Sequence, residues 1–183
     1  MAPRQTPTLM HRRGFLKTAV CGVLTCAASP VLAEFVEQRS VRFVHTHTGE
    51  TLQADYFRDG KYDQLALLSV AHTLRDFRSG EEHVIDPVLL DALFELQVLA
   101  DHDKPYQIIS AYRSPKTNDG LRRKSLGVAK RSLHMEGQAI DIRVAGVATT
   151  KLRDLALAMK VGGVGYYRGS DFLHIDTGRV RSW

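Results

Sequence analysis

The sequence has 183 residues, of which 44% are hydrophobic and 25% charged, which is typical of a globular domain with a core of its own. The formal net charge is +5, but the first 33 residues carry four of the basic side chains, and without them 21 basic residues face 20 acidic ones. We therefore expect no nucleic-acid partner. Both cysteines, Cys21 and Cys26, also lie in that segment, which excludes disulfides, a thiol nucleophile and cysteine-bound zinc from the rest of the chain.

Residues 1–33 have the pattern of an export signal. Their basic residues are followed by the apolar run TAVCGVLTCAASPVLA, which is rich in small residues and ends near Ala33, and this run is short for a membrane span. The segment HRRGFLK places two adjacent arginines before the run, which is the twin-arginine export pattern. We predict a twin-arginine signal over 1–33, a periplasmic location and a mature domain over 34–183. An uncleaved membrane anchor is the alternative.

The mature segment predicts one mixed domain. Strand-like alternation around the turn HTGE indicates a hairpin over 41–57, and helical spacing follows over 62–77, so that 34–85 forms an N-terminal hairpin and helix extension. Asp86 and Pro87 have the character of a helix cap and first helical residue. We expect a helix behind Pro87 and then a strand from Tyr106 to Tyr112, followed by a polar segment that could hold a short helix. A strand over 138–144 and a helix over 149–160, capped by Thr149 or Thr150, come next. Two short strands follow within 162–178. Because the last two strands are too close for a parallel crossover, we predict an α+β domain with a mostly antiparallel sheet packed with helices.

The stretch SLHMEGQAIDI contains two potential metal ligands, His134 and Asp141. On a helix, residues seven apart are separated by ~10 Å of rise, and in an extended chain by ~23 Å. Ligand atoms around one zinc ion must lie ~3–3.5 Å apart. The two side chains can therefore share a metal only if the chain turns back between them, and Gly137 is where that turn is easiest.

The strand after Gly137 supports this hypothesis. In QAIDIRV the isoleucines share one face, so that Asp141 points away from the hydrophobic layer. A third ligand is needed, and His174 in DFLHID is the best candidate, with Phe172 and Asp176 on its face. The competing interpretation is a structural histidine and an outward-facing strand aspartate, and the spacing alone does not exclude it.

Other motifs carry less information. His45 and His47 form a His-x-His pair without a third ligand nearby in the sequence, and a hairpin explains them. His72, His83 and His102 are expected to lie on the surface or in loops. The chain has no Gly-x-Ser-x-Gly elbow, which disfavours a serine hydrolase.

Four segments in the order SAYRS (110–114), SLHMEGQAID (132–141), GGVGYY (162–167) and FLHIDTG (172–178) resemble the murein endopeptidase K family. This family is related to the zinc D-alanyl-D-alanine carboxypeptidases of the hedgehog/DD-peptidase fold. HTGE, LRDFRSG, IDP and GVAK also resemble it, so that the likeness covers nearly all of 34–183. It implies a zinc-dependent endopeptidase that hydrolyses the peptide cross-links of peptidoglycan. The alternatives are a carboxypeptidase that trims terminal D-alanine and a non-catalytic, zinc-stabilised wall-binding domain.

The resemblance also implies roles for individual residues. His134, Asp141 and His174 would be the zinc ligands. Arg113 would lie beside them, where a guanidinium can stabilise an oxyanion or hold a substrate carboxylate; the alternative is a surface salt bridge. The related carboxypeptidases often carry an acidic residue three positions before the last histidine, and Asp171 holds that place. Asp171 is therefore our preferred general base. The alternatives are Asp176, which could instead orient His174, and Glu136.

Overall fold

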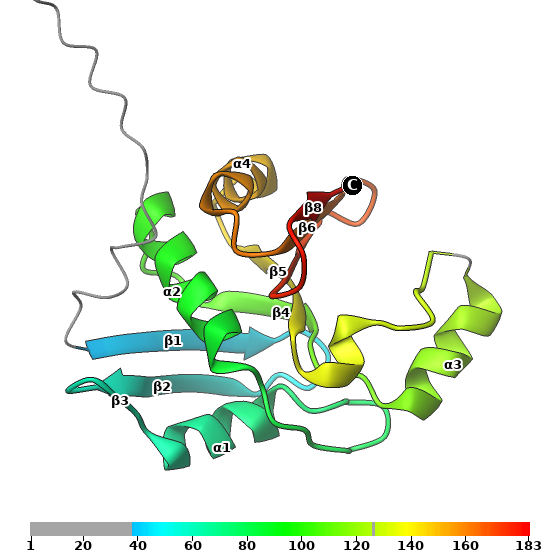
Figure 1. Ribbon diagram of the computed structural model, residues 1–183, viewed down its shortest axis with the longest axis horizontal. Coiled ribbons are helices and arrows are strands. Elements are labelled where there is room, and N and C mark those ends of the chain that lie inside the picture. Colours follow the sequence, from blue (N-terminus) through cyan, green and yellow to red (C-terminus); the bar gives the residue numbers. More distant parts are fainter. Residues whose placement is uncertain (1–37, 126) are drawn as a thin grey trace, which may run out of the picture.

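The computed structural model describes residues 38–125 and 127–183 (Figure 1). The predicted export signal over 1–33 lies outside the described residues. Within the described part, no helix has both the length and the apolar character needed to cross a bilayer.

The described chain contains short strands and four α-helices, mixed along the sequence. In chain order they are β1 (Gln38–His45), β2 (Thr51–Arg58), β3 (Lys61–Tyr62), α1 (Gln64–Thr73), α2 (Pro87–Ala100), β4 (Tyr106–Ser110), α3 (Pro115–Lys124), the 3-10 helix η2 (Leu133–Glu136), β5 (Ala139–Val144), α4 (Thr149–Met159), β6 (Gly163–Tyr167), β7 (Phe172–Asp176) and β8 (Arg181–Ser182).

The strands form one sheet with the order β3-β2-β1-β4-β5-β7-β6-β8. Only the pairs β1–β4 and β6–β8 are parallel among the described strands, and the other pairs are antiparallel. The predicted α+β class and mostly antiparallel sheet are confirmed. The hairpin β1–β2 joins the rest of the sheet through β1 and β4, so that the predicted N-terminal extension shares the sheet with the segment that carries the site.

Several predicted ends were wrong for identifiable reasons. Helix α1 is shorter than 62–77, because Asp63 accepts the N–H groups of Leu65 and Ala66 as its cap and the chain leaves the helix at Leu74. Helix α4 begins at Thr149 behind Ala148, which makes no side-chain cap hydrogen bond, so neither threonine is the cap. In contrast, Asp86 caps α2 and Pro87 is its first residue, as predicted.

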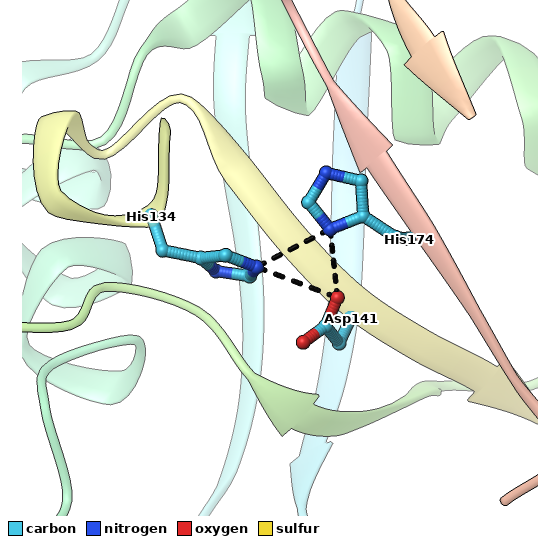
Figure 2. Close-up of side chains that lie close together, drawn as sticks. All are labelled: His134, Asp141 and His174. Atoms are coloured by element: carbon cyan, nitrogen blue, oxygen red, sulfur yellow. Dashed lines mark hydrogen bonds and ion pairs between the residues drawn. The ribbon is translucent and has the colours of Figure 1, made fainter. Parts of the chain in front are cut away.

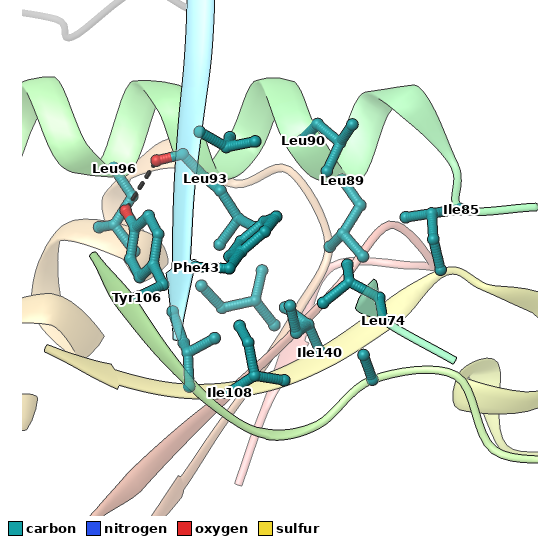
Figure 3. Close-up of a cluster of buried hydrophobic side chains, with 14 of the residues drawn as sticks. Phe43, Leu74, Ile85, Leu89, Leu90, Leu93, Leu96, Tyr106, Ile108 and Ile140 are labelled. Carbon is teal, nitrogen blue, oxygen red and sulfur yellow. Dashed lines mark hydrogen bonds between the residues drawn. The ribbon is translucent and has the colours of Figure 1, made fainter. Parts of the chain in front are cut away.

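The hydrophobic core lies between the helices and one face of the sheet (Figure 3). Phe43, Ile108 and Ile140 from the sheet meet Leu89 and Leu93 from α2, and all five are nearly or completely buried. The core also holds one polar anchor, the hydroxyl of Tyr106, which donates to the carbonyl of Leu93 over 2.7 Å. Helix α3 contributes only Asn118 to the buried residues and stands at the right-hand edge of the molecule in Figure 1.

Candidate metal centre

Gly137 makes the turn that the sequence predicted between His134 and Asp141. It follows η2 with φ 66° and ψ 17°, in the left-handed region, where glycine carries no steric penalty. The N–H of Gln138 donates to the carbonyl of Leu133, and this bond reverses the chain into β5. The turn is also packed tightly, because a Cβ on Gly137 would lie 2.0 Å from the carbonyl oxygen of Val84.

Asp141 and His174 are direct neighbours across β5 and β7. Ile140 and Ile142 are 0% exposed on the core side, so that Asp141 projects from the opposite face of β5, as expected from the strand period. His134 approaches from η2 and completes a triangle (Figure 2). All three side chains are buried, with exposed fractions of 4% for His134, 7% for Asp141 and 8% for His174.

The three facing atoms of the triangle have the spacing of ligands around one ion. His134 Nε2 lies 3.2 Å from His174 Nδ1 and 3.4 Å from Asp141 Oδ1, and His174 Nδ1 lies 2.9 Å from the same Oδ1. An ion held at ~2 Å from each atom requires separations of this size. Among the described residues this is the one group of three or more histidine and acidic side chains with such proximity.

Hydrogen bonds on the far sides of the rings leave the facing nitrogens free for a metal. His134 Nδ1 lies 2.7 Å from the carbonyl oxygen of Ala111, to which it donates, and His174 Nε2 lies 3.0 Å from Asp176 Oδ2. Because a neutral imidazole carries one proton, these bonds place it away from the triangle and direct the lone pairs of His134 Nε2 and His174 Nδ1 into it. The donor set and its outer partners therefore fit a divalent metal.

The electrostatics of the site favour a positive ion. Burial by itself would raise the pKa of Asp141, but His134 and His174 hold it below the usual range. Burial would lower the pKa of His174, but hydrogen bonds and charge from Asp141 and Asp176 raise it. Asp141 is therefore ionised at neutral pH, and the site attracts a proton to His174 where a metal is not bound.

Arg113 lies beside the triangle, as the sequence analysis expected. Its Nη2 is 4.0 Å from Asp141 Oδ2, and its Nη1 donates to Asn118 Oδ1 over 3.3 Å. The side chain is 9% exposed, and its Nε has no hydrogen-bond partner among the described residues. Burial lowers the pKa of the guanidinium, but arginine keeps its charge at neutral pH. Arg113 also lines the pocket beside the triangle, and a guanidinium there can bind an anionic group of a substrate.

The three carboxylates considered as the general base occupy different places. Asp176 is completely buried and accepts hydrogen bonds from His174, Arg181 and the N–H groups of Gly163 and Gly178. Asp171 is exposed in the turn between β6 and β7, with φ 46°. Glu136 is exposed at the end of η2.

The remaining histidines do not form a second metal group among the described residues. His45 is buried, and its Nδ1 accepts the N–H groups of His47 and Thr48 at the β1–β2 turn. His72 is exposed and pairs with Glu82.

The triangle forms part of the wall of a pocket of about 450 Å³. The lining includes the basic residues Arg113, Arg131 and Arg181, together with the aromatic residues Tyr167, Phe172 and Trp183. Sequence reasoning did not identify Arg181 or Trp183 as parts of the site. The signal available was that Trp183 is the only tryptophan of the sequence, but nothing in its spacing indicated that β8 returns to the metal ligands.

Two histidines and one aspartate whose free atoms converge on the wall of a pocket define a metal-dependent hydrolase of the type that binds one ion with three protein ligands. Comparisons with known proteins agree with this class. A family model described as "Peptidoglycan L,D-endopeptidase MepK" matches residues 33–183. The peptidoglycan L,D-endopeptidase MepK of Escherichia coli strain K12 is 48% identical over 137 residues, which are 75% of each chain.

A second relative is more distant. The probable peptidoglycan L,D-endopeptidase MepK of Haemophilus influenzae is 38% identical over 146 residues, 79% of this chain and 78% of the relative. The chain therefore belongs to the MepK family of metal-dependent peptidases.

Proposed function

We propose that this protein is a zinc-dependent peptidoglycan endopeptidase that hydrolyses peptide cross-links of the cell wall. The observation that carries the proposal is the buried triangle of His134, Asp141 and His174 on the wall of a pocket. The family relationship supports the substrate, because both relatives are named for endopeptidase action on peptidoglycan.

The ligand set supports zinc as the metal. Two imidazole nitrogens and one carboxylate are a set that zinc uses in hydrolases. Zinc, when bound, would supply the Lewis acidity that polarises an amide carbonyl and activates a water molecule. The protein's own part is to keep one proton of each imidazole on the nitrogen that faces Ala111 or Asp176, and to place the guanidinium of Arg113 beside the reacting amide. There Arg113 would stabilise the oxyanion or hold a substrate carboxylate.

Asp171 remains our choice as the general base. Both carboxylate oxygens of Asp176 already accept hydrogen bonds from neighbouring groups of the protein. A carboxylate bound in this way is suited to orient His174 rather than to take a proton from water. Asp171 is exposed and lies three residues before His174, the position of the acidic residue in the related carboxypeptidases.

The experiment that tests the function combines metal analysis of the mature protein with digestion of purified muropeptides, with and without a chelator. We expect about one zinc per chain and chelator-sensitive cleavage of cross-linked dimers. Cleavage restricted to uncross-linked pentapeptides would replace the endopeptidase by a D-alanine carboxypeptidase. Bound zinc without any turnover would favour a wall-binding domain.

Variants test the roles of the residues. His134→Ala is expected to abolish both metal binding and activity, whereas His72→Ala, which removes an exposed histidine, is expected to change neither. Asp171→Asn keeps a residue that tolerates a positive φ but cannot accept the proton. We expect it to retain zinc and lose most of the turnover, by roughly 10²-fold or more, and Asp59→Asn, at another positive-φ aspartate, is its control. Wild-type turnover in Asp171→Asn would transfer the role to another carboxylate.

The location of the enzyme is part of the proposal. The twin-arginine pattern in HRRGFLK supports export to the periplasm in the folded state. Replacement of Arg12 and Arg13 by lysine is expected to leave the protein in the cytoplasmic fraction. Unchanged export of this variant would contradict the twin-arginine route.

A further inference from the structure

Three aromatic side chains form a continuous surface on the rim of the pocket. Tyr167 and Phe172 face each other across β6 and β7 and stack with ring centroids 4.5 Å apart. The indole Nε1 of Trp183 donates to the hydroxyl of Tyr167 over 3.0 Å, and the indole lies 5.2 Å from the ring of His174. Trp183 is nevertheless 52% exposed, so that a large apolar surface beside the metal ligands is open to the pocket.

The sheet is built to admit this indole. Asp141, His174 and Gly165 form a row across β5, β7 and β6, and neighbours in such a row project from the same face. At Gly165 the row has no side chain, and the indole of Trp183 occupies the space: a Cβ on Gly165 would lie 2.5 Å from Trp183 Cε2. The indole is therefore the next side chain after the metal ligands along the pocket wall.

The backbone fixes Trp183 independently of its side chain. The N–H of Trp183 donates to the carbonyl of Val164, and the N–H of Tyr166 donates to the carbonyl of Trp183. At the start of β8, Arg181 is anchored to Asp176 by two hydrogen bonds. Replacement of the indole should therefore leave β8 in place.

The pocket is ordered along the sheet. Arg113 follows β4, and Asp141 and His174 lie on β5 and β7. The aromatic surface follows, with Phe172 at the start of β7, Tyr167 at the end of β6 and Trp183 behind β8, in the strand order β4-β5-β7-β6-β8. A peptide bound across these strands would have Arg113 on one side of its scissile amide and the aromatic surface, with Arg181 beside Trp183, on the other. Aromatic rings bind flat amide planes and aliphatic side chains with a large gain from buried apolar area.

From this arrangement we infer that Trp183 is a substrate-contacting residue: the stem-peptide segment on one side of the scissile amide lies against its indole. The inference rests on the proposed function, because it takes the peptide as the occupant of the pocket. It assigns Trp183 to substrate binding and not to metal binding, since the indole carries no metal-ligating atom.

The only tryptophan of the chain provides a direct test that needs no turnover. Metal-free full-length wild-type protein is titrated with a purified cross-linked muropeptide dimer while tryptophan emission is recorded. We expect a saturable change in the emission of Trp183 as its exposed face is covered. An unchanged emission at concentrations where equilibrium dialysis shows bound dimer would overturn the inference.

Variants separate the contact from a structural role. With the metal-loaded enzyme, Trp183→Ala is expected to raise KM by roughly ten- to fifty-fold, with kcat within about three-fold and zinc content unchanged. Trp183→Phe, which keeps an aromatic face, is expected to recover most of the loss. Gly165→Ala keeps the tryptophan but displaces the indole, and should raise KM in the same direction. Val180→Ala, an exposed apolar residue of the same segment that does not line the pocket, is the matched control.

The outcomes distinguish this inference from the proposed function. If the wild-type protein cleaves no muropeptide but its emission responds to the dimer, the hydrolytic function fails and the contact stands. If the wild-type protein cleaves the dimer and Trp183→Ala has the KM of the control, the contact fails and the function stands. Loss of zinc in Trp183→Ala would also overturn the inference, because the indole would then support the ligands.

Discussion

Asp176 shows how a completely buried carboxylate can serve a metal without touching it. Burial alone would raise its pKa, but hydrogen bonds from His174, Arg181 and the backbone N–H groups of Gly163 and Gly178 hold the pKa below the usual range. The group therefore stays charged and binds the Nε2 proton of His174 in place. This hydrogen bond fixes the orientation of the His174 ring, so we expect Asp176 to act as a positioning residue.

Replacement of Asp176 tests whether it supports the metal through His174. Asp176→Asn is expected to weaken zinc binding by about 10- to 100-fold, the usual range for loss of an outer partner of a metal-bound histidine. Competition with a chromophoric chelator measures the affinity, and the exposed Asp154→Asn is the control. Wild-type zinc affinity combined with lost turnover would instead identify Asp176 as the proton acceptor.

A second prediction concerns protons at His174. Because Asp141 and Asp176 raise its pKa, the ring in the metal-free protein keeps a proton to higher pH than a free histidine, and metal binding must displace that proton. Zinc affinity should therefore fall as the pH drops below neutrality, and zinc binding near neutral pH should release protons. Calorimetric titrations in buffers of different ionisation enthalpy measure this release. A binding enthalpy independent of the buffer would contradict the prediction.

At the scale of elements, the short 3-10 helix η2 depends on the loop that precedes α2. The N–H of Asp86 donates to the carbonyl of Gly137, and the second oxygen of Asp86 accepts from the hydroxyl of Thr177, just beyond β7. One residue thus caps α2 and connects the segments that carry His134 and His174. These contacts help to position η2, together with the hydrogen bonds that its own His134 makes with Ala111 and Arg113.

Gly137→Ala tests this dependence. The substitution combines a left-handed φ, which costs about 1–2 kcal/mol, with a clash of the new Cβ against the carbonyl oxygen of Val84. Gly146→Ala is the matched control, because Gly146 has φ 79° but nothing within 4 Å of the added Cβ. Denaturant unfolding should show a larger loss of stability for Gly137→Ala, and only this variant should lose zinc affinity. Equal losses of stability in the two variants would mean that the loop containing Val84 moves to make room for the added Cβ.

The site was more predictable from sequence than the ends of the elements, and the reason is physical. The alternation in QAIDIRV and the need for a turn at Gly137 follow from local geometry, so these features could be predicted from the residues, whereas the assignment of His134 and Asp141 as metal ligands rested on the family resemblance. His174 could be proposed only as a candidate, because its position opposite Asp141 depends on the pairing of two strands that are far apart in the sequence. The caps of α1 and α4 depend on competition between side-chain hydrogen bonds. Strand β8 has too few residues to show the alternation of apolar and polar residues that marks a strand.

At the scale of the whole molecule, the sheet makes one body of the N-terminal hairpin and the metal site. Strand β1 lies between β2 and β4, and Phe43 on β1 packs against Ile108 and the leucines of α2 (Figure 3). We therefore predict that a defect in the hairpin destabilises the site, although the hairpin ends at Arg58 and the first residue of the site is His134.

Phe43→Ala provides the measurement. Removal of a fully buried aromatic side chain costs about 3–5 kcal/mol, which should lower the thermal midpoint by roughly 10 °C for a domain of this size. Circular dichroism and zinc release should report one common transition. Leu65→Ala, at an exposed leucine, is expected to change the midpoint little. Release of zinc in a separate, earlier transition would show that the site unfolds independently of the hairpin.

The parallel pairing of β1 with β4 has a consequence for the order in which the protein is made. Strand β1 is synthesised first but acquires its second neighbour only after residues 106–108 have emerged, and the ligands His134, Asp141 and His174 follow later still. At a synthesis rate of about 5–20 residues per second, the last ligand leaves the ribosome seconds after the hairpin. A growing chain therefore has no complete coordination sphere, so that tight metal capture can only accompany the final closure of the sheet. The nascent peptidase is latent until its own folding is finished.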